Sequence, residues 1–281
     1  MIELDLTLVL TLALVALMAG FFDAIAGGGG LITLPVLFIA GIEPLAAIAT
    51  NKFQAASATV SATCAFARKG MIDWRQGSPM AVMSFIGGAL GALSITYVPK
   101  SVLQACVPPL LILIAAYFAF SPKPNEQARK AKISTSLFCI TVAPIIGFYD
   151  GIFGPGVGSF FMLACVILLG QHLIQAVCTS KLLNAACNLG ALSVFSLSGA
   201  IIWPLALAMA FAAFVGAQLG ARCAVHFGPR LIKPLLVCVC CIMATSCCST
   251  QATLLASGYI NLFSEKSITR FRTDCYATAP R

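Results

Sequence analysis

Two lysines lie in stretches of sequence that carry no other charge. Lys52 occurs in ATNKFQA, within residues 44–67, and Lys181 occurs in CTSKLLNA, within residues 173–198. An ammonium group at the centre of a membrane helix costs about 2.5 to 3.5 kcal/mol on the insertion scale. If these stretches cross a membrane, each lysine therefore faces the protein interior, where it pairs with a carboxylate or holds a negative ligand.

Two aspartates precede runs of glycine in equally apolar surroundings. Asp23 lies in GFFDAIAGGGG and Asp150 lies in GFYDGIFGPGVG. Two roles are open for these carboxylates. A partly desolvated carboxylate can load and release a proton near neutral pH, and a carboxylate can also cap the segment that follows a broken helix.

The glycine runs themselves predict breaks in the helices. Each glycine costs about 1 kcal/mol relative to alanine in a helix interior, and in a membrane a broken backbone is tolerated only beside protein or a water-filled cavity. The helix after each break would begin with free N–H groups, which bind anions, and Ser159 is available as a cap in the second segment. The alternative is that the glycines only allow close helix packing.

Together these residues predict a cationic pocket with neutral hydrogen-bonding partners. The predicted substrate-binding residues are Lys52, Lys181, Asn51, Ser180, Gln54, Asn184, Asn188, Gly27, Gly28, Gly29, Gly30, Gly154 and Gly156. Asp23 and Asp150 are predicted to couple protons or to cap helices. The competing hypothesis is that each lysine forms a structural ion pair with an aspartate and that nothing binds.

The composition indicates that the elements carrying these residues are membrane helices. Of the 281 residues, 60% are hydrophobic and only 9% are charged, against roughly 25% charged in an ordinary soluble domain. Apolar stretches near the 20 or so residues needed to cross a bilayer recur along the chain. We therefore predict an all-α, polytopic membrane helix bundle of about eight spans, with short broken or re-entrant helices after the glycine runs.

Charge and cysteine content exclude several other classes of function. The net charge of +8 is explained by basic loops that fix membrane topology, and we see no basic and aromatic patch for nucleic acid. The 13 cysteines lie mostly in apolar runs, where cysteine behaves as a small hydrophobe. We predict no metal site and no cofactor, and the sequence contains no motif of an enzyme.

Polar residues divide the chain into predicted helices and four regions. The helices are expected at 4–22, 31–41, 44–68, 78–97, 101–120, 133–150, 156–170, 173–198, 204–226 and 230–248. The regions are a first transmembrane repeat at 1–120, a polar linker at 121–132, a second repeat at 133–248 and an atypical polar tail at 249–281. The sequence turns polar from about Thr245, so we expect the tail to be poorly packed.

The two repeats are inferred from matching motifs. Asp23 matches Asp150 and, after a short insertion, Lys52 matches Lys181. The pattern G-x-I-x-W at Gly70 recurs at Gly199, and F-x-G-x-x-L-G-A at Phe85 recurs at Phe214. Chance does not reproduce one offset at so many positions, so the chain is predicted to be an internal duplication. Duplicated halves are a recurrent transporter design, with the substrate site near the midplane where the halves meet.

The relative direction of the repeats depends on the short segments 31–41 and 156–170. If these dip into the membrane and return, each half keeps four full crossings, which favours parallel repeats. Inverted repeats are the alternative. Under the parallel arrangement Arg222 would lie on the side opposite to Arg68, Lys69 and Arg75.

The quoted motifs resemble those of a known family. GFFDAIAGGGGLITLPVLFIAG followed by ATNKFQA, and GFYDGIFGPGVGSFF followed by TSKLLNAACNLG, look like the TauE/SafE sulfite exporter family of bacterial permeases, and most closely its YfcA-like branch. The resemblance runs from about residue 8 to 243. It implies a bacterial inner-membrane secondary transporter for small anions, typically sulfur oxyanions, organosulfonates or related carboxylates. The resemblance implies that functional residues lie at the same aspartates, glycines, lysines and amides as in the predicted pocket.

The leading hypothesis is therefore a permease in which a small anion binds between the halves and leaves after the halves rock. Its partners would be the anion and membrane lipid, without nucleic acid. Two alternatives remain from the residues alone: a membrane scaffold or receptor subunit that transports nothing, and a proton or cation channel that uses the aspartates.

Overall fold

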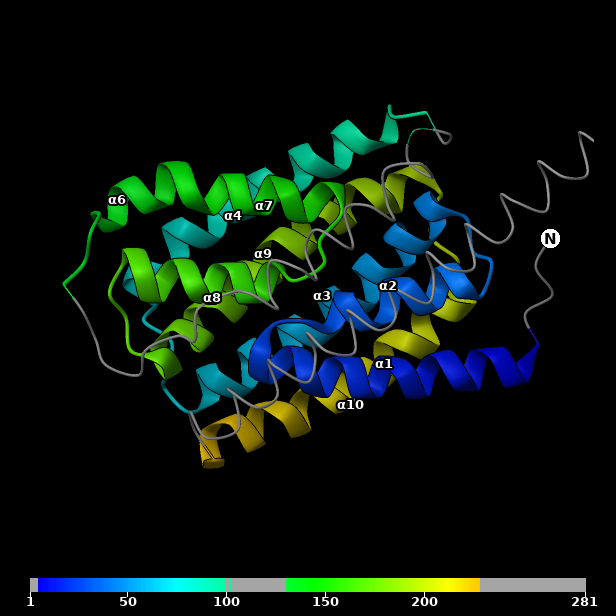
Figure 1. Ribbon diagram of the computed structural model, residues 1–281, viewed down its shortest axis with the longest axis horizontal. Coiled ribbons are helices and arrows are strands. Elements are labelled where there is room, and N and C mark those ends of the chain that lie inside the picture. The colour runs from blue at the N-terminus through cyan, green and yellow to red at the C-terminus, as the bar shows by residue number, and fades with distance from the viewer. Residues whose placement is uncertain (1–4, 100–101, 103–129, 228–281) are drawn as a thin grey trace, which may run out of the picture.

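The structure is a computed structural model that describes residues 5–99, 102 and 130–227 (Figure 1). Within these residues every regular element is a helix, so the all-α prediction is confirmed there. The predicted helix at 101–120 apart from residue 102, the predicted helix at 230–248, most of the linker at 121–132 and the tail at 249–281 lie outside the described residues.

The described helices follow the order expected from the sequence. The first group is α1 (Leu6–Ala26), α2 (Gly29–Ile39), α3 (Pro44–Arg68) and α4 (Trp74–Thr96). The second group is α6 (Thr135–Leu137), η1 (Phe138–Val142), α7 (Ala143–Ile152), α8 (Val157–Leu168), α9 (Leu173–Ser198) and α10 (Trp203–Phe227). The element η1 is a π-helical turn that joins α6 to α7 without a break in the chain direction.

The two helix boundaries that differ most from the prediction do so for identifiable reasons. The first helix continues to Ala26, because the glycine run interrupts it only at Gly27 and Gly28. The helix expected from residue 78 begins at Trp74, because the Asp73 side chain caps it by accepting hydrogen bonds from the amides of Arg75 and Gln76 at 3.0 and 3.3 Å. Aspartate is among the preferred N-cap residues.

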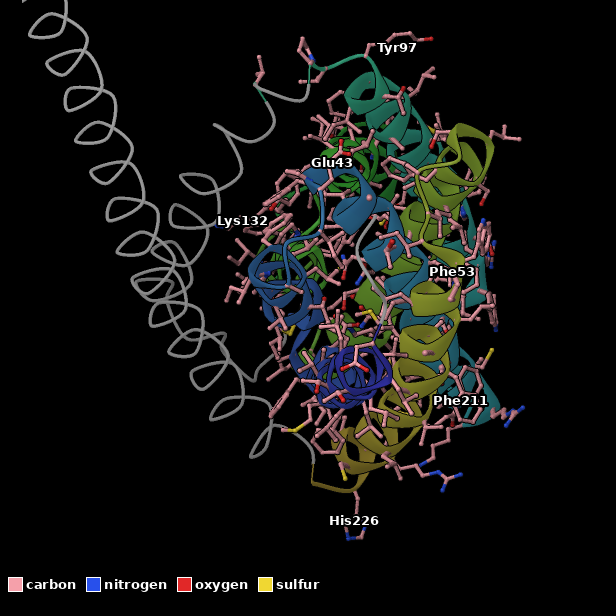
Figure 2. All side chains as sticks on the ribbon, turned by 90° about the vertical axis from the view of Figure 1, so that its right-hand side faces the viewer. Glu43, Phe53, Tyr97, Lys132, Phe211 and His226 are labelled. Carbon is pink, nitrogen blue, oxygen red and sulfur yellow. The ribbon has the colours of Figure 1, made fainter. Side chains whose placement is uncertain are left out.

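Apolar helices surround two long helices that carry buried polar residues. Within the described part of the chain, four helices or helical runs are long and apolar enough to cross a membrane, namely Leu6–Ala26, Trp74–Thr96, Thr135–Ile152 and Trp203–His226. With 25 and 26 residues, α3 and α9 would be roughly 38 Å long at 1.5 Å per residue. Both are more polar, and they contact each other in the middle of the bundle. Figure 2, which looks along the long axis, has mostly carbon in the side chains that project outward.

The helices pack in two groups that mix the halves of the chain. One group is α1, α3 and α10, and the other is α4, α7 and α9. Small residues let the backbones approach: a Cβ on Gly88 would collide with the carbonyl oxygen of Cys187, and one on Gly216 with that of Leu17. Close approach over small residues is a common basis of helix association in membranes. The last described helix of each half thus packs mainly on the other half.

Hydrogen-bond register gives the directions of the long helices. Ser57 Oγ donates to the carbonyl of Ala210 and Ser61 Oγ to that of Phe214, each at 2.9 Å over 153 residues, so α3 and α10 run in the same direction. Ser84 Oγ donates to Leu183 at 2.9 Å, and the same offset brings Gly88 against Cys187, so α4 and α9 also run in the same direction.

The matched helices therefore run antiparallel, and the expectation of a parallel arrangement is wrong. Because the chain reverses direction between α3 and α4, at residues 69–73, α3 and α9 point in opposite directions, as do α1 and α7 (Figure 1). The physical reason lies in the first two helices. The parallel prediction treats α1 as a full crossing, whereas α2 returns the chain to the end at which α1 began, so α1 and α2 together do not change sides.

The two ends of the bundle differ in charge. Arg68, Lys69, Arg75, Lys130, Lys132 and Arg222 lie at one end, called the basic end below. The opposite end, with Asp5 and Glu43, has no lysine or arginine among the described residues. Arg222 lies on the same side as Arg68, and not opposite as the parallel arrangement required, because α3 and α10 are parallel.

Candidate functional site

The glycine runs break the chain at two places in the interior. Gly27 ends α1 in the left-handed region, with a φ of 85°, and its amide donates to the carbonyl of Asp23 at 2.8 Å. In the second half Gly154 and Gly156 have φ values of 96° and 78° between α7 and α8. Glycine adopts this conformation without the steric cost that a Cβ brings. Both breaks lie where the sequence predicted them.

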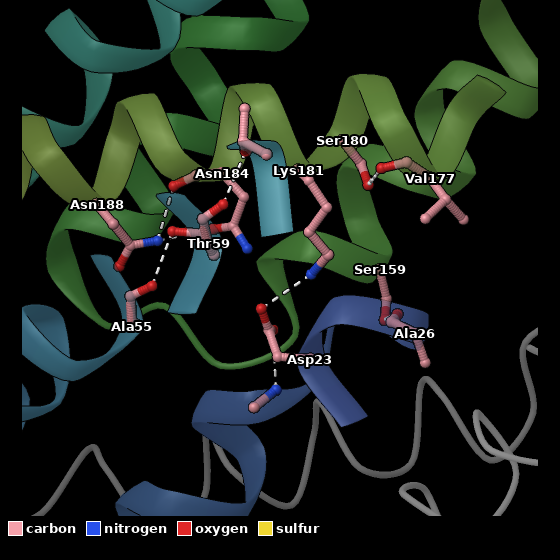
Figure 3. Close-up of polar contacts among 12 residues, drawn as sticks. Asp23, Ala26, Ala55, Thr59, Ser159, Val177, Ser180, Lys181, Asn184 and Asn188 are labelled. Atoms are coloured by element: carbon pink, nitrogen blue, oxygen red, sulfur yellow. Dashed lines mark hydrogen bonds and ion pairs between the residues drawn. The ribbon is translucent and has the colours of Figure 1, made fainter. Parts of the chain in front are cut away.

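The two breaks contact each other directly. The amide of Ser159 donates to the carbonyl of Gly27 at 3.2 Å, and Ser159 Oγ donates to the carbonyl of Ala26 at 2.6 Å (Figure 3). A Cβ on Gly27 would collide with the backbone of Gly158 and Ser159. Ser159 was expected to cap its own helix; this is wrong, because its hydroxyl satisfies the open end of α1 instead.

Each buried lysine pairs with an aspartate from the other half of the chain. Lys52 Nζ on α3 lies 2.7 Å from Asp150 Oδ1 on α7. Lys181 Nζ on α9 lies 2.9 Å from Asp23 Oδ2 on α1 (Figure 3). Both lysine side chains are only 1% exposed. Removing one member of such a pair leaves an uncompensated buried charge, which typically costs about 3–5 kcal/mol.

The remaining oxygens of the two carboxylates differ. Asp23 Oδ1 accepts a hydrogen bond from the amide of Gly29 at 3.0 Å, which is the geometry of a cap on the start of α2. Asp150 Oδ2 has no hydrogen-bond partner among the described residues. Near this carboxylate, a Cβ on Gly154 would collide with Lys52 Nζ and would lie 2.8 Å from Asp150 Oδ1, so only glycine leaves room for the ion pair.

A small cavity lies beside the breaks. The volume open to the centre of a water-sized molecule is about 20 Å³, which holds roughly one or two waters. It is lined by Ala19, Gly20, Asp23, Gly27, Gly29, Gly30, Asn51, Lys52, Gln54, Ala55, Ala58, Thr59, Asp150, Gly154, Gly156, Val157, Gly158, Asn184 and Asn188. The cavity thus collects both aspartates, one of the two lysines and the buried amides of α3 and α9.

Most of the residues predicted for binding line this cavity, and three do not. Lys181 is buried in its ion pair away from the lining, and Gly28 is also outside it. Ser180 Oγ donates to the carbonyl of Val177 in its own helix at 2.8 Å. Asn51 lines the cavity while its Oδ1 accepts from Thr33 Oγ1 at 2.6 Å.

Sequence reasoning missed several lining residues. Thr59 and Gly158 are the informative ones, because the offset that matches Lys52 to Lys181 also matches Thr59 to Asn188 and Gly29 to Gly158. Carrying the candidate residues across that offset would have found both. The small residues Ala19, Ala55, Ala58 and Val157 carry no such signal, since an apolar residue in an apolar helix has no mark of its own.

The amides of α9 form a small network at the cavity wall. Asn188 Nδ2 donates to the carbonyl oxygen and to Oδ1 of Asn184, both at 2.8 Å. Thr59 Oγ1 donates to the carbonyl of Ala55 at 2.7 Å on the facing helix (Figure 3). The site therefore offers amide and hydroxyl groups beside an ion pair. Among the described residues, no group of three or more His, Cys, Asp and Glu side chains could hold a metal ion.

The pairing half of the competing hypothesis matches the observed geometry, since each lysine does meet an aspartate. That hypothesis does not explain the polar cavity beside the pair of Lys52 and Asp150. A ligand in this cavity would meet one lysine, two carboxylates and several side-chain amides.

Comparisons with known proteins identify one family and several relatives. A family model described as "Sulfite exporter TauE/SafE" matches residues 12–247. The chain is 46% identical over 237 residues to "Probable membrane transporter protein ORF9" of Sinorhizobium sp., covering 84% of this chain and 91% of that protein. It is 42% identical over 230 residues to "Probable membrane transporter protein YfcA" of Escherichia coli, covering 82% and 86%. A "Probable membrane transporter protein" of Haemophilus influenzae is 40% identical over 235 residues, covering 84% and 92%. No solved structure matches the chain.

Proposed function

Because the chain belongs to the sulfite exporter TauE/SafE family, we propose that it moves small anions as a secondary transporter. The cargo is a sulfur oxyanion, an organosulfonate or a related organic anion. That the chain is a bacterial membrane transporter follows from the family and from the relatives' names. These names describe an exporter and membrane transporters.

The buried lysine at the cavity wall carries the anion part of this proposal. Lys52 is 1% exposed, lies in the first half of α3 (Pro44–Arg68), and lines a polar cavity between two helix breaks. An ammonium in this position is costly in a membrane unless it is paired or functional. An anion in the cavity would be attracted by this ammonium charge and would accept hydrogen bonds from the nearby amides of Asn51 and Asn184.

Charge balance supports coupling to a positive charge. Lys52, Lys181, Asp23 and Asp150 sum to zero when all four are ionised. An anion added to a buried neutral cluster leaves a net negative charge, which is strongly unfavourable in a low dielectric. A proton bound by Asp150 or Asp23 would restore neutrality and free a lysine for the anion. We therefore propose that transport is proton-coupled.

The small volume of the cavity supports a closed state. Space for roughly one or two waters does not accommodate an oxyanion such as sulfite. The cavity must therefore widen when cargo enters. Movement of the group α1, α3 and α10 against the group α4, α7 and α9 would widen it, because the two ion pairs and the contact between α3 and α9 join these groups.

The repeat hypothesis is part of the same proposal. Each ion pair joins a lysine of one half to an aspartate of the other half. Exchanging the two halves therefore turns one pair into the other, as expected for two inverted copies. Inverted repeats with broken helices at the midplane are a recurrent transporter architecture. Among the described helices, the proposed full crossings are α3, α4, α9 and α10, while α1 with α2 and α7 with α8 each return to the side on which they began.

Orientation follows from the charge asymmetry of the two ends. Cytoplasmic loops of membrane proteins carry an excess of lysine and arginine. We therefore propose that the basic end faces the cytoplasm and that the protein resides in the inner membrane.

Transport by purified protein in liposomes tests the function. Radiolabelled sulfite, thiosulfate and small sulfonates should enter saturably with the native chain. In the double variant Lys52→Met/Asp150→Leu, which removes the charges together, uptake should fall by about 10- to 100-fold, the loss expected for a charged hydrogen bond. Lys132→Met, an exposed lysine of the basic end, is the control and should transport normally.

Normal uptake by a correctly folded double variant would show that the assignment of Lys52 is wrong. Absence of uptake for every anion with the native chain would instead favour the scaffold hypothesis.

A further inference from the structure

Three buried oxygens at the cavity lack hydrogen bonds. Gln54 Oε1, Asp150 Oδ2 and Asn188 Oδ1 accept none from any residue that the structure describes. All three residues are at most 2% exposed, and all three line the cavity. A buried polar atom left unsatisfied is costly, and native proteins contain few of them. Three at one cavity indicate a ligand that donates hydrogen bonds or carries positive charge.

The chemical identity of two of these atoms is fixed by their surroundings. The Asn188 amide cannot be reversed, because its Nδ2 already donates to two oxygens of Asn184 at 2.8 Å, so the open atom is an oxygen. In an ionised Asp150 both oxygens are acceptors, and Lys52 occupies only Oδ1. The Cys187 thiol lies near this carboxylate. Its Sγ is a weak donor and hydrogen-bonds to the carbonyl of Asn184 at 3.3 Å.

The surroundings suit a cation as well. The carboxyl ends of α1 and α7 reach the two breaks, and a helix end of this kind carries a partial negative charge. Broken helices in other secondary transporters use such ends to coordinate sodium. Oxygen atoms are the ligands that hard cations prefer. The volume open to a water-sized centre, about 20 Å³, suits a small ion and one water.

We propose that Gln54, Asp150 and Asn188 form a sodium site, in which the ion contacts Asp150 Oδ2 while Lys52 keeps Oδ1. This inference rests on the proposed transport function, because bound sodium would supply the positive charge that an entering anion requires. Sodium and a proton would then compete for the same carboxylate. The anion would occupy the lysine side of the cavity after it widens.

Thermal unfolding of the purified full chain tests sodium binding without any transported anion. The protein is compared in sodium, potassium and choline chloride at equal ionic strength. We expect sodium alone to raise the apparent melting temperature, by about 3–6 °C when it is present at roughly ten times its Kd. Gln54→Met and Asn188→Leu keep the side-chain size and remove the oxygen, so each should lose most of this shift.

Gln171→Met is the matched control. Gln171 Oε1 is also buried without a partner among the described residues, but Gln171 does not line the cavity, so this variant should keep the sodium shift. Equal melting temperatures in the three salts would overturn the sodium site, and so would an undiminished shift in both cavity variants. A stability that changes with pH but not with sodium would also overturn it, and would assign Asp150 to a proton.

The transport proposal can fail separately. Sodium-specific stabilisation in a protein that takes up no anion would support the ion site and refute the proposed cargo. Anion uptake that ignores a sodium gradient, together with no sodium shift, would refute only the ion site.

Discussion

At the residue scale, the crosswise ion pairs set the character of the site. The sequence was sufficient to predict that Lys52, Lys181, Asp23 and Asp150 lie in the interior, because charge in an apolar stretch has few other places to go. It could not predict which aspartate meets which lysine. That choice depends on the tertiary fold, in which α7 brings Asp150 to α3 and α1 brings Asp23 to α9. No sequence pattern within a single helix encodes which helices meet.

The pair between Lys52 and Asp150 gives a stability prediction. Lys52→Met should lower the free energy of unfolding by about 3–5 kcal/mol, because it leaves the Asp150 carboxylate buried without its partner. Adding Asp150→Leu should recover most of that loss, since the second change removes the uncompensated charge. Equilibrium unfolding in mixed detergent micelles measures both values.

The exposed Lys132→Met should change the same free energy by no more than about 0.5 kcal/mol. If Lys52→Met and the double variant were equally unstable, side-chain packing and not charge would explain the loss.

At the element scale, the breaks were predictable and their mutual contact was not. Runs such as AGGGG and GPGVG mark broken helices through the cost of glycine alone. The link from Ser159 to the open end of α1 joins residues that are 133 positions apart, and no local pattern encodes it. The π-helical turn at Phe138–Val142 was also not predicted, since its residues read as an ordinary apolar helix.

Ser159→Ala tests the link between the breaks. Loss of the hydrogen bond to Ala26 leaves a buried carbonyl without its donor and should destabilise the fold by about 1–3 kcal/mol. Hydrogen exchange should quicken at the amides of Gly27 and Ser159, which hold the breaks together.

Ser193→Ala is the matched control, because its hydroxyl bonds only to Gly190 in the same helix. Equal effects of the two substitutions on exchange near Gly27 would contradict a special role for Ser159.

At the scale of the whole molecule, composition predicted a helical membrane protein, and the helix order followed from polar interruptions. The direction of the halves was predicted wrongly, because the sequence gives no sign that α2 returns to the end where α1 begins. Once that hairpin is known, the basic residues from Arg68 to Arg222 fall at a single end. Charge asymmetry then becomes evidence for orientation.

Cysteine labelling in intact cells checks the orientation. In a chain whose native cysteines are replaced, a single cysteine at Glu43 or Tyr97 should react with a membrane-impermeant maleimide. A single cysteine at Lys69 or Lys132 should react only after the cells are opened. These positions lie at opposite ends of the bundle, so the two pairs control for each other. Labelling of Lys69 and Lys132 in intact cells would reverse the proposed orientation.

The mixed packing of the halves affects how the protein is made. Among the described helices, α4 packs mainly on α7 and α9, which the ribosome delivers only after many more residues have been added. Until then the glycine-rich face of α4 lacks these described partners, and lipid or a chaperone covers it. The same holds for α1, whose main neighbour α10 is the last described helix to emerge. Final assembly therefore waits for nearly the whole polypeptide, and a prematurely stopped product is a ready substrate for membrane proteases.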